Sequence, residues 1–300
     1  MSIEVKSLTK IYGEQKAIDQ LSFNIAKGEI VGFLGPNGAG KSTTMKILTG
    51  YLAPNEGNCR ICGLDLKENP IEAKRKTGYL PEANPLYPDL YVKEYLDFIA
   101  DLHEVKNKRE KIREVINMTG LEPESRKKTG QLSKGYKQRV GLAASLIHDP
   151  EVLILDEPTS GLDPNQIIEI RELIKKLGQQ KTVLFSSHIL QEVEAICDRV
   201  IIIHQGKLVA DDRLSQLQAR NKTNQVQIKF AEEVEPQWLE KLSQAKSVRR
   251  LDRFQWEIES DGPAELRKQL MELALQNNLN IVSLQSESQS LEDVFRGLTN

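Results

Sequence analysis

One segment, GPNGAGKST at residues 35–43, constrains the fold of this chain more than any other. It fits the spacing Gly-x4-Gly-Lys-Ser, follows the apolar run EIVGFL and precedes the helix-forming stretch TTMKILTG. Glycines at this spacing let backbone N–H groups turn inward on phosphate oxygens, and the dipole of a following helix favours the same anion. The segment therefore predicts a strand, a phosphate-binding loop and a helix, in that order.

The side chains of this loop predict what it binds. Lys41 can reach the β and γ phosphates of a nucleotide and is counted as catalytic, and Ser42 can ligate magnesium. Further nucleotide contacts are expected from Gly35, Pro36, Asn37, Gly38, Ala39, Gly40 and Thr43. ATP and Mg²⁺ are therefore the expected ligands.

A second segment, VLILDEP at residues 152–158, is an apolar strand that ends in two carboxylates. Such a strand end lies at the carboxyl edge of a parallel sheet, beside the phosphate loop. Asp156 is expected to hold magnesium, directly or through water, while Glu157 orients and deprotonates the water that attacks the γ-phosphate. The alternative is a pair of solvated acids with no catalytic role.

Apolar runs rich in β-branched residues alternate with helical patterns along the first part of the chain. The runs are EIVGFLG, EVLILDEP, TVLFSSH and RVIIIHQGK. This alternation predicts an α/β core of parallel strands covered by helices on both faces. Residues 88–147 instead carry helix-period patterns and predict a helical insert. The strand IEVKSLT, which precedes Tyr12, is expected at a sheet edge.

The pattern changes after the stretch LSQLQARNKTNQ, and we place a domain boundary near residue 220. Segments within residues 225–286 predict strand, helix, strand, strand, helix and strand, which is the order of a ferredoxin-like unit. A last helix is expected at residues 290–298, and Trp238 and Trp256 are predicted core residues. The chain is thus divided into a domain of residues 1–220 and an accessory domain of residues 221–300.

Composition excludes several classes of protein. The 300-residue chain has 28% charged and 39% hydrophobic residues and a net charge of −2, so nothing favours nucleic acid as a partner. No export signal opens the sequence, and its apolar runs are far shorter than the about 20 residues of a membrane-spanning helix. Cys59 and Cys62 form a lone CxxC pair without further ligands, and we interpret them as incidental strand residues rather than a metal or redox site.

Three more segments carry a family resemblance. They are LSKGYKQR at residues 132–139, SGLD at residues 160–163 and SSH ending at His188. Together with the two phosphate-site segments, they resemble the signature, D-loop, switch-histidine, Walker A and Walker B motifs of ATP-binding-cassette (ABC) ATPases, in the same order. The resemblance covers about the first 220 residues. It implies a P-loop NTPase fold with a RecA-like core and a helical subdomain.

The resemblance also implies how the site is assembled. Members of this family dimerise head to tail, so that the signature helix of one subunit closes on the ATP held by the other. Ser133 and Gly135 are expected to meet the γ-phosphate in this way, and Asp163 lies in the D-loop. His188 is expected to hydrogen-bond the γ-phosphate and brace the attacking water, and Tyr12 to stack on adenine.

The sequence departs from the family pattern at three positions. Glu82 stands where the family usually has a glutamine that senses magnesium and the transport subunit. A carboxylate can still bind magnesium there, although a simple solvated loop acid is the alternative. Lys134 and Tyr136 replace the glycine and glutamine of the signature. Lys134 either adds charge near the γ-phosphate or points to water, and the sequence does not choose.

The altered signature, the segment LPE and the trailing LEDVF resemble the ABC-2-type subgroup, which includes drug, polysaccharide and gliding-motility transporters. The predicted function is therefore the ATP-hydrolysing motor subunit of such a transporter, paired with a separately encoded membrane permease. One cassette per chain implies a homodimer or a close paralogue as partner. The accessory domain is expected to regulate the cassette or support its dimer.

The expected location is the cytoplasm, at the inner face of the cell membrane and held there by the permease. The alternative function is a soluble ABC ATPase that acts on ribosomes or nucleic acid, although this chain has no tandem cassette or basic patch. A small-metabolite kinase is disfavoured, because such an enzyme does not need a signature helix.

Overall fold

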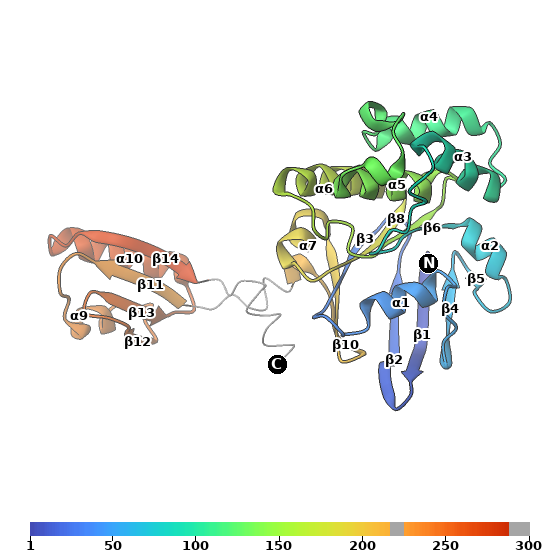
Figure 1. Ribbon diagram of the computed structural model, residues 1–300. Coiled ribbons are helices and arrows are strands. Elements are labelled where there is room, and N and C mark those ends of the chain that lie inside the picture. The colour runs from blue at the N-terminus through green and yellow to red at the C-terminus, as the bar shows by residue number, and fades with distance from the viewer. Residues whose placement is uncertain (217–224, 288–300) are drawn as a thin grey trace. The chain divides into compact units, whose positions relative to one another are not determined.

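The computed structural model describes residues 1–216 and 225–287 (Figure 1). The chain separates into two compact units that divide after Leu214. The boundary that we predict near residue 220 lies outside the described residues.

A six-stranded, mostly parallel sheet forms the centre of the first unit. Its strands are β3 (Ile30–Leu34), β6 (Thr77–Leu80), β7 (Val152–Leu155), β8 (Thr182–Ser187), β9 (Arg199–His204) and β10 (Lys207–Arg213). They lie in the order β10-β9-β3-β8-β7-β6, and all neighbours are parallel except the pair β9 and β10. Every residue of β7 and β8 is buried, because the sheet is covered on both faces. The predicted parallel α/β core is confirmed.

A smaller antiparallel sheet packs on the same core. Its strands are β1 (Ile3–Tyr12), β2 (Gln15–Ile25), β4 (Glu56–Ile61) and β5 (Leu64–Asp65), in the order β2-β1-β4-β5. The strand before Tyr12 is therefore an interior strand, and the expected edge position is wrong: β1 pairs with β2 on one side and with β4 on the other. Its partner β4 follows only after the phosphate loop, so short-range patterns do not reveal the pairing.

Three helices each follow a strand of the parallel sheet, namely β3, β7 and β8, and a fourth helix precedes β6. They are α1 (Lys41–Leu48), α6 (Pro164–Gly178), α7 (Leu190–Ile196) and α2 (Pro70–Arg75). Met45 of α1, Phe23 of β2 and Phe33 of β3 belong to one buried cluster, and the rings of Phe23 and Phe33 lie 5.6 Å apart. A single apolar core therefore joins the two sheets and α1.

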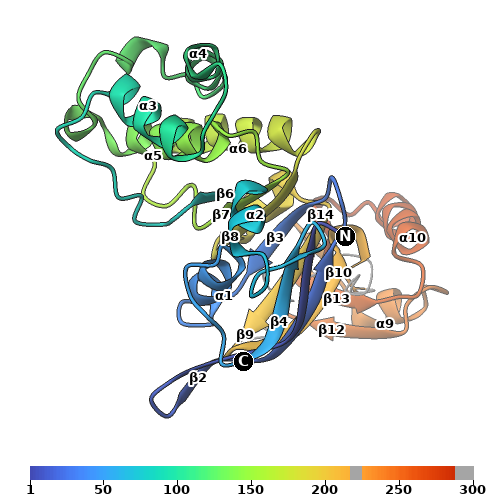
Figure 2. The same cartoon turned by 90° about the vertical axis from the view of Figure 1, so that its right-hand side faces the viewer.

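Residues 88–147 form the expected helices. These are α3 (Val92–Leu102), α4 (Lys108–Met118) and α5 (Lys134–Leu146), with short 3₁₀ turns at Glu122–Glu124 and Thr129–Gln131. In both views, α3 and α4 lie beyond α5 as seen from the parallel sheet (Figures 1 and 2). The backbone of α5 approaches β6 so closely that a Cβ at Gly78 would overlap the carbonyl oxygen of Ser145. α5 is therefore the element that joins these helices to the sheet.

The second unit is a four-stranded antiparallel sheet with two helices. Its elements are β11 (Gln225–Phe230), α9 (Pro236–Glu240), β12 (Ser247–Arg250), β13 (Gln255–Glu259), α10 (Pro263–Gln276) and β14 (Ile281–Glu287). The strand order β12-β13-β11-β14 and the chain order agree with the predicted ferredoxin-like unit. Trp256 is 2% exposed in its core, and Trp238 packs against the same cluster. The helix expected at residues 290–298 lies outside the described residues.

Within residues 1–216 and 225–287, no helix combines the length and the apolar character needed to cross a membrane.

Two histidines stack where α3 and α5 end. The rings of His103 and His148 lie 3.9 Å apart and are nearly parallel, and the Nε2 atom of His148 lies 3.1 Å from the carbonyl oxygen of Thr77. The pKa of His148 is lowered to about 4, chiefly by burial, and the neighbouring His103 acts in the same direction. The folded unit therefore holds His148 in its neutral form.

We expect this histidine to make the first unit less stable in acid. Above pH 6.5 His148 is neutral in the folded and the unfolded chain and contributes no pH dependence. As the pH falls from 6.5 toward 4, the unfolded chain takes up the proton first, so the free energy of unfolding falls by up to about 3 kcal/mol. Urea unfolding of His148→Gln, followed by circular dichroism between pH 7.5 and 4.5, should show a smaller decline than wild type.

Tryptophan fluorescence provides the control for this experiment. Both tryptophans, Trp238 and Trp256, lie in the second unit, so their emission reports unfolding of that unit alone. The fluorescence transition should be the same in His148→Gln and wild type. Identical acid sensitivity of both proteins by circular dichroism would contradict a role for His148.

Candidate functional site

A pocket of about 450 Å³ lies at the carboxyl edge of the parallel sheet. It is lined by Ala17, Asn37, Gly38, Gly40, Lys41, Ser42, Thr43, Glu82, Glu157, Ser160 and His188. Apart from Ala17 of β2, these residues come from the phosphate loop and the start of α1 after β3 and from the segments that follow β6, β7 and β8, because neighbouring parallel strands end at one edge. The topology thus brings together most of the site residues that the sequence predicts.

The phosphate loop has the backbone that its glycines predict. Gly38 and Gly40 have positive φ angles of 81° and 103°, and Gly40 is the N-cap of α1. A Cβ at Gly40 would also lie 2.5 Å from the carbonyl oxygen of Ala17, so only glycine fits this position. Lys41 is 6% exposed, and its ammonium donates hydrogen bonds to the carbonyl oxygens of Gly35 and Pro36 at 2.8 and 3.3 Å. The loop therefore presents a helix N-terminus and a buried cation to the pocket.

Asp156 lies directly behind the loop and is 1% exposed. Its Oδ1 atom accepts hydrogen bonds from Ser186 Oγ at 2.7 Å and from Ser42 Oγ at 3.2 Å. Burial raises the pKa of Asp156, and these two hydrogen bonds act in the opposite direction. A hydroxyl and a carboxylate held side by side are hard oxygen donors of the kind that Mg²⁺ prefers, so Ser42 and Asp156 fit that ion.

Glu157 adopts a left-handed backbone conformation, with φ of 49°, that is uncommon for a residue with a side chain. Its N–H donates to Ser186 Oγ at 2.8 Å. Its carboxylate lies between two nitrogen groups: Oε1 is 3.5 Å from the ammonium of Lys41, and Oε2 is 2.9 Å from Nδ1 of His188. Three of the residues singled out in the sequence therefore form one cluster, in which the acid is buried and the histidine is half exposed.

The other two residues singled out around the nucleotide take different places. Glu82, in the loop after β6, lines the same pocket as Lys41 and Glu157. Tyr12, at the end of β1, is 49% exposed, and the ammonium of Lys10 lies 5.5 Å from its ring centre. Tyr12 does not line the pocket, but it pairs with Gln15 in the hairpin that also brings in Ala17. An exposed ring at this position is accessible to a flat ligand.

The signature segment does not line this pocket. Ser133 caps α5, its Oγ accepting from the N–H of Tyr136 at 3.3 Å, and neither Ser133 nor Gly135 lines the pocket. Asp163 caps α6 and accepts from the N–H of Gln166 at 3.0 Å. The Gln166 amide lies directly over Gly135, where a Cβ would overlap it. The chain thus brings the signature next to its own D-loop helix rather than to its own phosphate loop.

Lys134 lies over the D-loop of its own chain. Its ammonium and the end of its stem occupy the space that a Cβ at Gly161 would need, and Gly161 has a positive φ of 68°. The positive φ favours glycine at position 161, whereas the flexible end of Lys134 could move aside for a Cβ. Lys134 is also exposed, so this contact is compatible with the solvated side chain that the sequence left open beside a γ-phosphate contact.

Sequence reasoning missed the hydroxyls that hold the cluster in place. Ser186 bonds both Asp156 and the backbone of Glu157. Its position before the switch histidine was the available signal, but a serine in a buried strand has several ordinary explanations.

The CxxC pair shows no special chemistry in its surroundings. Cys59 is buried in β4, where burial raises the pKa of its thiol to about 12. Cys62 lies in the turn that follows. In the part of the chain that the structure describes, no group of three or more His, Cys, Asp or Glu side chains is arranged to hold a metal ion.

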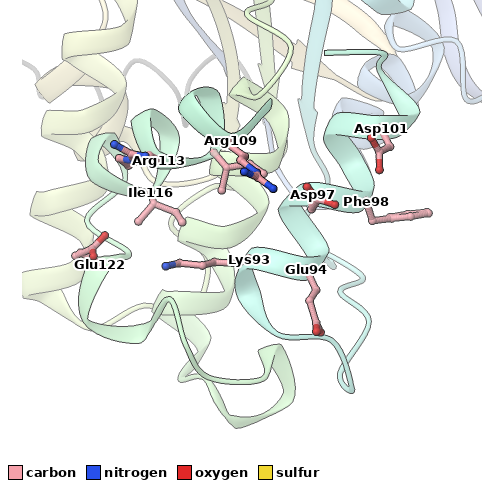
Figure 3. A pocket seen from close by; sticks show the side chains of 10 residues that line it. Lys93, Glu94, Asp97, Phe98, Asp101, Arg109, Arg113, Ile116 and Glu122 are labelled. Carbon is pink, nitrogen blue, oxygen red and sulfur yellow. The ribbon is translucent and has the colours of Figure 1, made fainter. Parts of the chain in front are cut away.

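A larger groove of about 770 Å³ lies between α3 and α4 (Figure 3). Apolar side chains of Phe98, Ile112 and Ile116 line it together with charged side chains of both signs. The charged residues are Lys93, Glu94, Asp97, Asp101, Arg109, Arg113 and Glu122. None of the predicted site residues lines this groove, so volume alone does not identify the functional site.

Comparison with known proteins agrees with the site geometry. Residues 18–160 match the ABC transporter family, and residues 213–299 match the C-terminal domain of DrrA1-3-like ATP-binding proteins. The bacitracin transport ATP-binding protein BcrA of Bacillus licheniformis is 37% identical over 98% of this chain and 95% of its own. The linearmycin resistance ATP-binding protein LnrL of Bacillus subtilis is 32% identical over 99% and 98%.

A solved structure extends the similarity to three dimensions. An ATP-binding cassette, described as a dimer in a post-hydrolysis state bound to ADP and Pi, has a TM-score of 0.66 and 28% identity. It covers 71% of this chain and 98% of its own. The chain belongs to the ABC transporter family of ATP-binding proteins.

Within that family, it is an ABC ATPase of the ABC-2-type group. The predicted family, fold and enzymatic class are confirmed. The alternative of an ATPase acting on ribosomes or nucleic acid is not supported, because the relatives reported above are named as transport and resistance proteins.

The phosphate pocket makes a direct prediction for Lys41→Ala. A hydrogen bond to a charged group contributes about 1.5–3 kcal/mol, so loss of the ammonium should weaken ATP binding about 10- to 100-fold. Titration calorimetry with ATP measures this change. Lys46→Ala is the matched control, because Lys46 lies in the last turn of the same helix and does not line the pocket. Equal affinities of the two variants would contradict the role of Lys41.

Proposed function

We propose that this chain hydrolyses ATP at the described pocket and that two copies use the reaction to drive a separately encoded membrane permease. The observation that supports this most is the cluster of Lys41, Glu157 and His188, in which one buried carboxylate lies between an ammonium and an imidazole. A carboxylate so held can accept a proton from water beside the γ-phosphate, as a general base requires.

In this proposal each group of the cluster has one task. Lys41 binds the β and γ phosphates, and His188 hydrogen-bonds the γ-phosphate and the attacking water. Glu157 takes a proton from that water. At the same time the oxygen of the water bonds to the γ-phosphorus, and the bond between the γ-phosphorus and the ADP oxygen breaks. Ser42 and Asp156 would hold Mg²⁺, with Glu82 of the same pocket as a further ligand, and the bound ion would supply positive charge next to the phosphates. Tyr12 stacks on the adenine ring.

The dimer is the second part of the proposal. Ser133 and Gly135 lie apart from the pocket of their own chain, at the N-terminus of α5, where backbone N–H groups favour an anion. A second copy, placed head to tail, gives each signature a γ-phosphate to bind and places Asp163 at the interface. Because one chain holds residues for both halves of the site, two equal copies suffice. The related cassette described as a dimer supports this arrangement.

The transported compound is the third part. Relatives named for bacitracin transport and linearmycin resistance align along nearly the whole chain, which favours export of an antibiotic-like compound. In this proposal the subunit lies at the inner face of the cell membrane, where the permease docks near the Glu82 loop. The second unit regulates the cassette or supports the dimer.

Replacing Glu157 with glutamine tests the hydrolytic role directly. The amide keeps the shape of the side chain but cannot accept the proton, so phosphate release should fall by about 100- to 10,000-fold. ATP should still bind, because Lys41 and the phosphate loop are unchanged. Light scattering should then detect a stable ATP-bound dimer. Unchanged phosphate release would remove Glu157 from the mechanism.

Replacing Ser133 with arginine tests the dimer. The bulky cation should block the approach of the partner's γ-phosphate, so turnover is lost while one chain still binds ATP with wild-type affinity. Gln179→Arg, an exposed change at the end of α6, adds the same charge away from the signature and should leave turnover intact. A loss of ATP affinity in the Ser133 variant would mean that the signature acts on the nucleotide of its own chain.

A further inference from the structure

One buried acid of the first unit has no part in the chemistry described so far. Glu192 lies in the first turn of α7, and its side chain is 2% exposed. Its Oε2 atom accepts two hydrogen bonds, from Thr159 Oγ1 at 2.7 Å and from Ser187 Oγ at 2.8 Å. A buried carboxylate is costly unless it is hydrogen-bonded, so this arrangement needs an explanation beyond packing.

The two hydroxyls that bond Glu192 come from the two segments that carry the proposed base and the switch histidine. Thr159 follows Glu157 by two residues in the loop after β7, and Ser187 immediately precedes His188 at the end of β8. The strands β7 and β8 are parallel neighbours, so both segments leave the sheet side by side. One carboxylate therefore links the two loops from behind the pocket.

The segment before His188 is held at a second point by the same serine. Ser187 Oγ accepts a hydrogen bond from the N–H of Ile189 at 3.0 Å. The backbone on both sides of His188 is thereby tied to the hydroxyl that Glu192 binds. His188 itself is 46% exposed, and its ring depends on the position of this short segment.

Glu157 also needs support from its surroundings. Its left-handed backbone, with φ of 49°, is strained for a residue with a side chain, and such a conformation persists only where neighbouring contacts hold it. Ser186 holds its N–H on one side, and the bond from Thr159 to Glu192 holds the chain two residues further on. The 2.9 Å contact between Glu157 and His188 joins two segments that Glu192 connects.

The opposite oxygen of Glu192 takes part in an ion pair but in no hydrogen bond. Its Oε1 atom is buried without a hydrogen-bond partner, and the nearest guanidinium nitrogen of Arg171, on α6, is 3.8 Å away. This distance exceeds that of a hydrogen bond. The well-formed contacts of the carboxylate are thus those to the loops of Glu157 and His188.

We propose that Glu192 is a positioning residue for ATP hydrolysis: its carboxylate holds the Thr159 and Ser187 hydroxyls together and thereby keeps Glu157 and His188 at working distance. The inference rests on the proposed roles of Glu157 and His188. In this role Glu192 affects the rate of the chemical step, whereas ATP binding depends on the phosphate loop.

The test compares two replacements of Glu192 in the full chain. Glu192→Leu keeps the volume but removes the acceptor, and kcat for ATP hydrolysis should fall about 10- to 100-fold because a small misplacement of reacting groups is costly. KM for ATP should stay within about twofold, since Lys41 is untouched. In Glu192→Gln the amide oxygen still accepts both hydroxyls, and kcat should return to within about threefold of wild type.

Two further variants make the result specific. Thr159→Val removes one of the two donors without changing shape, so kcat should fall, and adding it to Glu192→Leu should lower kcat no further, because both changes break one link. Glu194→Leu alters an exposed acid of the same helix and should leave kcat unchanged. If Glu192→Leu does not fold, the two other variants are sufficient: the proposal requires a lower kcat in Thr159→Val and a nearly wild-type kcat in Glu192→Gln.

Each contrary outcome identifies what fails. Wild-type kcat in Glu192→Leu or in Thr159→Val overturns the inference, and so does a change confined to KM or an equal loss in Glu192→Gln. Glu157→Gln, assayed in parallel, separates this from failure of the proposed function. If Glu157→Gln is inactive while Glu192→Leu is fully active, only the positioning role is wrong. If Glu157→Gln is fully active, the base assignment itself fails.

Discussion

The site of this protein depends on one buried carboxylate and its two nitrogen neighbours. Glu157 lies between the ammonium of Lys41 and the imidazole of His188, which belong to three separate segments of the chain. Only the order of the central sheet brings them together, because β3, β8 and β7 are consecutive neighbours whose carboxyl ends meet at one edge. The phosphate loop, the acid and the histidine thus follow the carboxyl ends of three neighbouring parallel strands of one sheet.

The hydrogen bonds behind this cluster come from hydroxyl groups, and one ion pair, between Glu192 and Arg171 at 3.8 Å, lies beside them. Ser186 bonds Asp156 and the N–H of Glu157, and Ser187 and Thr159 both bond Glu192. Short hydroxyl side chains lose little conformational freedom when they are ordered, which suits a strained backbone such as that of Glu157. The acid and its hydroxyl partners are buried, while the half-exposed His188 remains accessible from the pocket.

Much of the fold followed from local patterns. The apolar strands, the helical insert and the strand and helix order of the second unit all appear in the structure where hydrophobic periodicity predicts them. The position of β1 did not, because its neighbour β4 comes from beyond the phosphate loop and α1. The supporting roles of Ser186 and Glu192 were also missed: the SSH segment pointed to His188 and not to its serines, Glu192 has no motif spacing, and each bonds a residue about thirty positions away.

By itself, the sequence determined that a triphosphate loop exists at residues 35–43, because the needed backbone is set by closely spaced glycines and the helix that follows them. It also determined which side chains stand at strand ends. The tertiary structure decided which of those ends are neighbours, that Glu157 is left-handed, and that Lys134 lies on Gly161 of its own chain. The physical reason is that closely spaced motif residues set the local backbone conformation, whereas the distances between segments far apart in the sequence are set by the packing of the whole sheet.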